Sequence, residues 1–153
     1  IICPDEFKTL EASGGYFYSW SGPGVQMPYN DSVLVVTGPG TYCVIVTDSS
    51  TNGCIGSAMS CATLTSPPIP VVSASASLLC PDDSVMVTAS GGVYYDWYGP
   101  SGLLSDSGSV IYGNEGGFYY AYAHDTSGCT LVSNPVEIQQ YSTPSSQNPP
   151  LFS

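Results

Sequence analysis

The sequence predicts an all-β protein built from two antiparallel β-sandwiches in tandem. One set of motifs occurs twice, 77 residues apart, apolar side chains alternate with polar ones along short segments, and Gly and Pro separate these segments. Alternation with a period of two is the pattern of strands, and Gly-Pro clusters favour turns. Charged residues make up 8% of the chain, against about 25% in an average soluble domain, and no segment has the period of an amphipathic helix.

The repeat is the strongest of these observations, because its motifs keep one register. Near the end of the second copy one turn is two residues shorter than in the first, and otherwise the order is the same. Two copies of a unit of about 75 residues follow, each large enough for a small sandwich with a thin core. The main matches are Cys3-Pro4-Asp5 with Cys80-Pro81-Asp82, Ala12-Ser13-Gly14-Gly15 with Ala89-Ser90-Gly91-Gly92, Tyr18-Ser19-Trp20 with Tyr95-Asp96-Trp97, and Gly53-Cys54 with Gly128-Cys129.

The alternating segments also set the expected domain boundaries. Residues 70–79 alternate as an opening strand of the second unit, but nothing equivalent precedes Cys3, so the first unit lacks this strand in the chain. We expect one sandwich over residues 1–66 and a second over 67–140. Residues 141–153 form a Pro/Ser-rich linker or a strand for a neighbouring unit, and the chain is then a segment of a longer array.

Composition excludes several classes of partner. The formal net charge is -11, and Lys8 is the only lysine or arginine. Nucleic-acid binding needs clustered Lys and Arg, and so does attraction to anionic lipid. No apolar run approaches the 18 residues or so of a membrane span, so we expect no membrane insertion. The six cysteines, without CxxC or metal-type spacing, indicate disulfides and an extracellular or cell-surface location.

The order of the repeated motifs resembles a known group of proteins. Cys-Pro-Asp, Ala-Ser-Gly-Gly, Tyr-x-Trp, Gly-x-Tyr and Thr-Asp…Gly-Cys follow one another much as in the immunoglobulin-like or PKD-like repeat domains of surface adhesins secreted by gliding bacteria of the Bacteroidota type. The resemblance covers nearly the whole chain. It implies immunoglobulin-like sandwiches with Greek-key connections in a long cell-surface or filamentous protein with an adhesive or structural role. Cys43 and Cys61 depart from the pattern, because the second copy has Tyr120 and Val136 in their places.

Cys43 and Cys61 are expected to form a cross-strand disulfide. They lie on consecutive strands joined by the turn from Asp48 to Cys54, and Tyr120 should likewise face Val136.

The other four cysteines allow two pairings. Pairing within a unit joins Cys3 to Cys54 and Cys80 to Cys129. These positions lie at opposite poles of an immunoglobulin-like unit some 25 to 35 Å long, whereas bridged Cα atoms lie within about 7 Å. If units stack head to tail, Cys3 bridges instead to Cys129, and Cys54 and Cys80 bridge to neighbouring units. Both pairings stay open at this point.

The aromatic residues divide into core and surface candidates. Trp20 and Trp97 occupy the third-strand position at which sandwiches bury a tryptophan, and we expect core rather than sugar-stacking roles for them. Tyr42 and Tyr119 fit a tyrosine corner, in which the hydroxyl ties a strand to the preceding loop. Too many tyrosines remain for so small a core, and exposed tyrosine suits lateral contacts or glycan recognition. These remaining tyrosines are Tyr94, Tyr112, Tyr120 and Tyr122.

Two kinds of short motif have a structural and a functional interpretation. The acidic pairs Asp5-Glu6 and Asp82-Asp83 recur beside the Cys-Pro turn, where they either cap the turn or bind calcium as the chain's one candidate cofactor. Asp31-Ser32-Val33 and Asp83-Ser84-Val85 resemble the O-glycosylation motif of the same bacterial group, at Ser32 and Ser84. Asn30 begins a formal N-glycosylation sequon, and short motifs of this kind also arise by chance.

The inventory for catalysis is poor, and we do not expect an enzyme. His124 is the only histidine, and no serine elbow or nucleophilic-cysteine context accompanies it. The expected function is that of a structural or adhesive repeat segment, stacked end to end with neighbouring copies and stapled by disulfides. The alternative is a glycan- or protein-binding module that uses exposed tyrosines.

Overall fold

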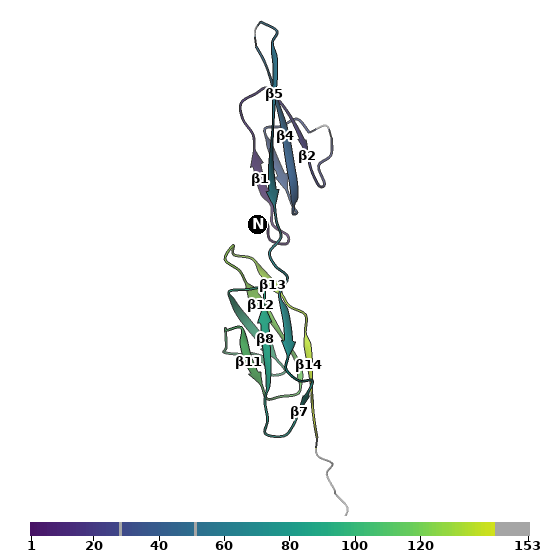
Figure 1. Ribbon diagram of the computed structural model, residues 1–153, viewed down its shortest axis with the longest axis vertical. Coiled ribbons are helices and arrows are strands. Elements are labelled where there is room, and N and C mark those ends of the chain that lie inside the picture. The colour runs from purple at the N-terminus through teal and green to yellow at the C-terminus, as the bar shows by residue number, and fades with distance from the viewer. Residues whose placement is uncertain (28, 51, 143–153) are drawn as a thin grey trace, which may run out of the picture. The chain divides into compact units, whose positions relative to one another are not determined.

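The computed structural model describes residues 1–27, 29–50 and 52–142, and these residues form strands without any helix (Figure 1). The chain divides into two compact units, unit 1 from Ile1 to Pro67 and unit 2 from Pro68 to Ser153. The linker or strand expected at 141–153 lies outside the described residues from residue 143 onward.

Unit 2 is a complete sandwich of two sheets. One sheet has the order β11-β8-β6, and the other has the order β10-β9-β12-β14-β7 with β13 on β12. All strand pairs are antiparallel except β14 with β7. The chain crosses between the sheets from β8 to β9 and from β11 to β12, as in immunoglobulin-like sandwiches, so the predicted all-β fold class is confirmed. The strands are β6 (Val71–Ala74), β7 (Leu78–Leu79), β8 (Val85–Ser90), β9 (Tyr94–Gly99), β10 (Gly102–Leu103), β11 (Val110–Gly113), β12 (Gly117–His124), β13 (Thr130–Val132) and β14 (Val136–Gln140).

Unit 1 repeats this arrangement with fewer strands. A two-stranded sheet, β1-β3, faces a three-stranded sheet, β2-β4-β5. Strands β4 and β5 form a long hairpin, paired without interruption from Gly40 opposite Leu64 to Ser49 opposite Ile55. The strands are β1 (Lys8–Glu11), β2 (Phe17–Ser21), β3 (Val33–Val36), β4 (Gly40–Ser49) and β5 (Ile55–Leu64).

The corresponding hairpin of unit 2 is interrupted, and this corrects one expectation. Tyr122 lies opposite Val132, but Tyr119 lies opposite Val136, so the register shifts by one residue between β13 and β14. Val136 therefore faces Tyr119 and not Tyr120. The shift falls at residues 133–135, which leave the ladder, and Pro135 lacks the N–H that a continuous ladder needs.

A tryptophan lies at the centre of each core, as predicted. Trp97 is fully buried among eleven core residues, and its Nε1 donates to the Gly108 carbonyl at 2.8 Å. Trp20 is 3% exposed in a core of five, and its Nε1 donates to the Asp31 carbonyl at 2.8 Å. From its smaller core we expect unit 1 to gain less stability from apolar burial than unit 2.

Both expected tyrosine corners are present. The Tyr42 hydroxyl donates to the Gly38 carbonyl, and the Tyr119 hydroxyl donates to the Glu115 carbonyl, each at 2.9 Å. A Cβ at Gly113 would lie 2.8 Å from the Tyr119 ring, so glycine is needed there for the ring to fit. Burial raises the pKa of Tyr119 above its ordinary value.

Replacing Tyr119 with phenylalanine is expected to lower the free energy of unfolding of unit 2 by about 1–2 kcal/mol, because the Glu115 carbonyl loses its donor. A raised pKa in the folded state means that the stability from this group is present at pH below the unfolded tyrosine pKa. It is lost as the pH rises through the folded pKa, and the phenylalanine variant should lose less stability in that alkaline range. Urea denaturation from pH 7 to 11 measures both effects, with Tyr112→Phe as control, since Tyr112 is 68% exposed.

Candidate functional site

The outward side of β9 and β12 in unit 2 carries an aromatic face, which consists of Tyr94, Tyr98, Tyr120, Tyr122 and His124. The period of two along each strand produces it, because the residues between them turn inward and are buried. Tyr94 is 51% exposed and Tyr122 is 38% exposed, and the other three are half-buried. The face is therefore open to a ligand or a neighbouring protein.

Ring contacts hold the aromatic face in order. Tyr98 lies opposite Tyr120 in the ladder and stacks on it, with ring centroids 5.2 Å apart. The Tyr122 ring meets both edge-on, at 5.7 Å from Tyr98 and 6.1 Å from Tyr120. Offset stacking and edge-on contacts are the favoured geometries of aromatic pairs, so these three rings form one preorganised cluster.

His124 joins three strands at the other end of the aromatic face. Its ring stacks on Tyr94 at 4.3 Å, and its Nε2 lies 2.8 Å from Asp96 Oδ2 on β9. Its Nδ1 lies 2.9 Å from Thr130 Oγ1 on β13. Since the carboxylate only accepts, Nε2 is the donor to Asp96, and Nδ1 and the Thr130 hydroxyl share the second hydrogen bond. These bonds fix the ring orientation across β9, β12 and β13.

Sequence reasoning found part of this face. Tyr94, Tyr120 and Tyr122 were expected at the surface and belong to the face, whereas Tyr112 is exposed on β11 in the other sheet. Tyr98 was missed, although its spacing from Tyr94 along the strand is the signal that places both on one side.

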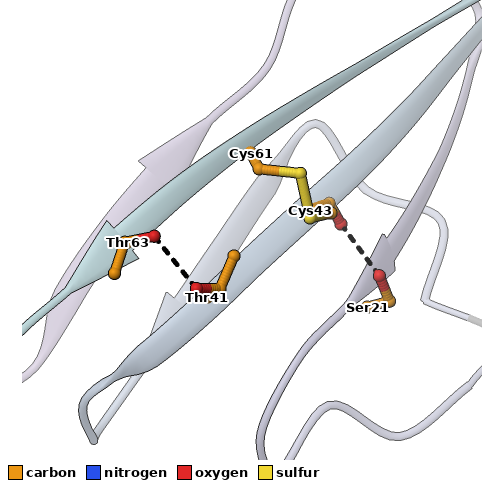
Figure 2. Close-up of a disulfide and its surroundings, with 5 residues drawn as sticks. All are labelled: Ser21, Thr41, Cys43, Cys61 and Thr63. Atoms are coloured by element: carbon orange, nitrogen blue, oxygen red, sulfur yellow. Dashed lines mark hydrogen bonds between the residues drawn. A yellow bond between two sulfur atoms is a disulfide. The ribbon is translucent and has the colours of Figure 1, made fainter.

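The corresponding face of unit 1 carries a disulfide in place of the aromatic cluster. Cys43 and Cys61 lie directly opposite each other on β4 and β5 and are bonded, as Figure 2 shows. Beside them the hydroxyls of Thr41 and Thr63 are hydrogen-bonded at 2.9 Å, and Ser21 Oγ donates to the Cys43 carbonyl at 3.4 Å. By the repeat register, Cys43 stands where unit 2 has Tyr120.

The remaining cysteines differ in state. Cys54 and Cys80 are free and exposed, whereas Cys3 and Cys129 are not free. In unit 2, β7, which precedes Cys80, and the β12–β13 hairpin, which contains Cys129, lie at opposite ends of the sandwich (Figure 1). The pairings of Cys3 with Cys54 and of Cys80 with Cys129 are therefore absent from the structure.

Asp125 shapes the turn that presents Cys129. Its carboxylate accepts hydrogen bonds from the Ser127 hydroxyl and from the Ser127 and Cys129 amides, at 2.7 to 2.9 Å. The bond from the Ser127 side chain, followed by the backbone bonds, holds the pKa of Asp125 below its ordinary value. The turn is thus ordered at neutral pH, when the carboxylate is charged.

The two acidic pairs stand at matching turns. Asp5 and Asp82 both have positive φ, of 60° and 62°, directly after a proline, and the amides of Glu6 and Asp83 donate back to the cysteine carbonyls at 3.2 Å. Proline followed by a residue of positive φ is the pattern of a type II turn. Asp5 and Asp82 therefore have a backbone role in these turns.

The carboxylate of Glu6 is used within its own turn. It accepts from the Cys3 amide at 2.9 Å and pairs with Lys8 at 2.8 Å, and the Lys8 hydrogen bond is the main cause that lowers the pKa of Glu6. Within residues 1–27, 29–50 and 52–142, no three His, Cys, Asp or Glu side chains gather as a metal site would require. Calcium binding at Asp5, Glu6, Asp82 and Asp83 stays a prediction.

The three glycosylation candidates lie at or near the surface. Ser84 and Asn30 are exposed and Ser32 is half-buried. Asn30 Oδ1 accepts from the Tyr18 amide at 2.8 Å, so this side chain also holds the loop against β2. Modification at these residues stays a prediction.

Several solved structures show a partial likeness to this chain. No known family and no curated protein matches the sequence. The structure is similar to that of murine CEACAM1b, at 14% identity and a TM-score of 0.42 over 92% of this chain and 95% of that one. It is similar to the amphioxus IgVJ-C2 molecule, at 15% identity and a TM-score of 0.40 over 90% and 98%.

A third similar structure is that of a Bacteroides ovatus protein. SGBP-B of the mixed-linkage glucan utilization locus, in complex with a mixed-linkage heptasaccharide, is 14% identical, with a TM-score of 0.29 over 93% of this chain and 42% of that one. The resemblance to gliding-adhesin repeats stays an expectation. No helix in the described part of the chain is long and apolar enough to cross a membrane.

Proposed function

We propose that this chain is a structural and adhesive repeat segment of an extracellular assembly, in which sandwiches stack end to end and disulfides link successive copies. One observation carries the proposal. Each unit has one cysteine in its Cys-Pro turn and one in its hairpin, and one cysteine of each kind, Cys80 and Cys54, is free and exposed.

The positions of these cysteines support linkage between units. In unit 1 the N-terminus, near Cys3, lies at the opposite end of the sandwich from the β4–β5 hairpin that carries Cys54 (Figure 1). Within one unit, therefore, the Cys-Pro turn and the hairpin do not meet, and the proposal pairs them between units. Under the proposal Cys3 bridges to Cys129, and Cys80 of one copy bridges to Cys54 of the next.

The link between copies is an ordinary oxidation. Two thiols lose two protons and two electrons to an oxidant, such as dioxygen or an oxidised dithiol, as one S–S bond forms. An oxidising location outside the cell would supply such an oxidant. With -11 of net charge, the copies repel one another, so covalent bonds would oppose this repulsion.

Wild-type protein incubated in air is expected to give a ladder of multiples of 15.9 kDa on non-reducing gels, and regular fibres in negative-stain micrographs. The ladder should collapse on reduction, and Cys54→Ala and Cys80→Ala should each prevent it, because either change removes one partner of the bond between copies. Peptide mapping should recover Cys54 bonded to Cys80. A ladder that persists in the double variant, or isolated globules at high concentration, would contradict the proposal.

The aromatic face supports a second candidate function, recognition of a glycan. Exposed, preorganised tyrosine rings suit stacking on sugar faces, and the negative charge of the chain favours a neutral glycan over an acidic one. A mixed-linkage glucan heptasaccharide is a suitable probe. Titration by calorimetry should show binding that Tyr98→Ala abolishes and Tyr112→Ala retains, and the absence of binding to neutral oligosaccharides would exclude this function.

A further inference from the structure

Unit 1 has a hollow at the place where unit 2 carries its opening strand. In unit 2, β6 lies along β8 with Val72 opposite Ala89, and Val72 is 2% exposed. By the repeat register β1 corresponds to β8 and Ala12 to Ala89. Among the described residues β1 pairs only with β3, so its other edge is open.

The hollow consists of two adjoining parts. A part of about 290 Å³ lies over Trp20 and Val44, between β1 and β5, and a part of about 430 Å³ continues it towards Gly14 and Met59. The two parts share Ser13, Val46 and Ser60 in their walls. We call this continuous hollow the strand groove.

The floor of the strand groove is less covered than its counterpart. Val46 and Leu10 are half-buried, whereas the corresponding Ala123 and Val87 in unit 2 are 2% and 0% exposed. Although the Val46 side chain is larger than that of Ala123, it does not fill the strand groove. The groove thus exposes apolar surface that β6 covers in unit 2, and a strand that filled it would remove this surface from water.

We propose that the strand groove binds residues 150–153 of a second copy of this chain as a β-strand antiparallel to β1. Pro150-Leu151-Phe152-Ser153 matches Pro70-Val71-Val72-Ser73, the start of β6, in its order of proline, two apolar residues and serine, with a connection three residues longer than the 77-residue register gives. In the register of β6, Leu151 lies opposite Ser13, Phe152 opposite Ala12 and Ser153 opposite Glu11. Phe152 then takes the place of the buried Val72.

The repeat supports a donor segment that follows a unit. The residues that follow β5, the last strand of unit 1, lead into β6 and fill the next unit, not the unit that they leave. Thr143-Pro144 matches Ser66-Pro67 at the start of that connection. Residues 150–153 hold the corresponding place after unit 2, and under the proposal they fill unit 1 of another copy. This inference rests on the proposed end-to-end assembly, and it identifies residues that would be in contact where two copies meet.

A fluorescent peptide with the sequence of residues 145–153, amidated to keep a carboxylate away from Glu11, tests the inference by anisotropy. The partner is the full chain with Cys54→Ala, Cys80→Ala and Phe152→Asp, so that neither disulfides nor its own terminal segment compete. Binding is expected, and it should be about ten- to a hundredfold weaker for a peptide with Phe152→Asp. Ala62→Glu, at an exposed groove wall, should weaken binding similarly, whereas Thr63→Glu on the opposite face should not.

The outcomes separate this inference from the proposed function. Absence of binding, or equal binding of both peptides, overturns the strand groove even if the wild-type chain still forms a disulfide ladder. If the peptide binds and Phe152→Asp weakens its binding, but the wild-type chain forms no ladder or fibres, the strand-groove inference is supported and the disulfide-linked array is overturned. The peptide variant does not affect folding of the chain, so a misfolded Ala62→Glu protein would not obscure the result.

Discussion

Trp97→Ala is expected to destabilise unit 2 by about 3–5 kcal/mol, the range for removing a large aromatic side chain from a core. Trp97 is fully buried, contributes to a core of eleven residues and satisfies the Gly108 carbonyl through its Nε1. Alanine leaves a cavity and an unpaired carbonyl at the same place. Tyr112→Ala removes an aromatic ring that is 68% exposed and should leave stability nearly unchanged.

The two tryptophans allow the unfolding of each unit to be followed separately. The chain has one tryptophan in each unit, so fluorescence of the Trp97→Ala variant reports on Trp20 and unit 1 alone. In urea, circular dichroism should show an early transition from unit 2 while the Trp20 signal keeps its wild-type midpoint. A Trp20 midpoint that falls by the same amount would mean that the two units unfold as one, and a loss below 1 kcal/mol would contradict the assigned core.

Most of the fold follows from features that a single sequence displays. Trp20, Trp97, Tyr42 and Tyr119 were placed correctly because inward and outward residues alternate along a strand, and because the second copy repeats each position. The repeat also identified the extra cysteine pair. The other four cysteines occur in both copies, whereas Cys43 and Cys61 occur only in the first.

The features that were missed depend on pairing between strands. The one-residue shift at residues 133–135 moved Val136 opposite Tyr119, and no local pattern except Pro135 signals it. Likewise, Thr130 reaches His124 only because β13 pairs with β12 in one particular register. Register of this kind arises from tertiary packing, which alternation along one strand does not specify.

Replacing both Cys43 and Cys61 with alanine is expected to destabilise unit 1 by about 3 kcal/mol, the chain-entropy value for closing a loop of similar length. The two cysteines are separated by 18 positions in sequence. This loss is large relative to the free energy of unfolding of a small domain, which is only about 5–15 kcal/mol. Unit 1 also has the smaller core and an open strand groove. Urea denaturation followed by Trp20 fluorescence in a Trp97→Phe background measures it, with Cys54→Ala as the matched control.

The same experiment shows what the disulfide does for the sheet. At the corresponding outer position unit 2 has no covalent bond, and Tyr120 instead stacks on Tyr98 beside a core twice as rich in buried residues. If unit 1 of the Cys43→Ala, Cys61→Ala variant is unfolded at 37 °C, the disulfide offsets the stability that unit 1 lacks because its apolar groove is uncovered. Adding the strand-groove peptide should then restore part of the lost stability in proportion to its concentration. A double variant as stable as the Cys54→Ala control would show instead that the β4–β5 ladder holds unit 1 without the bond.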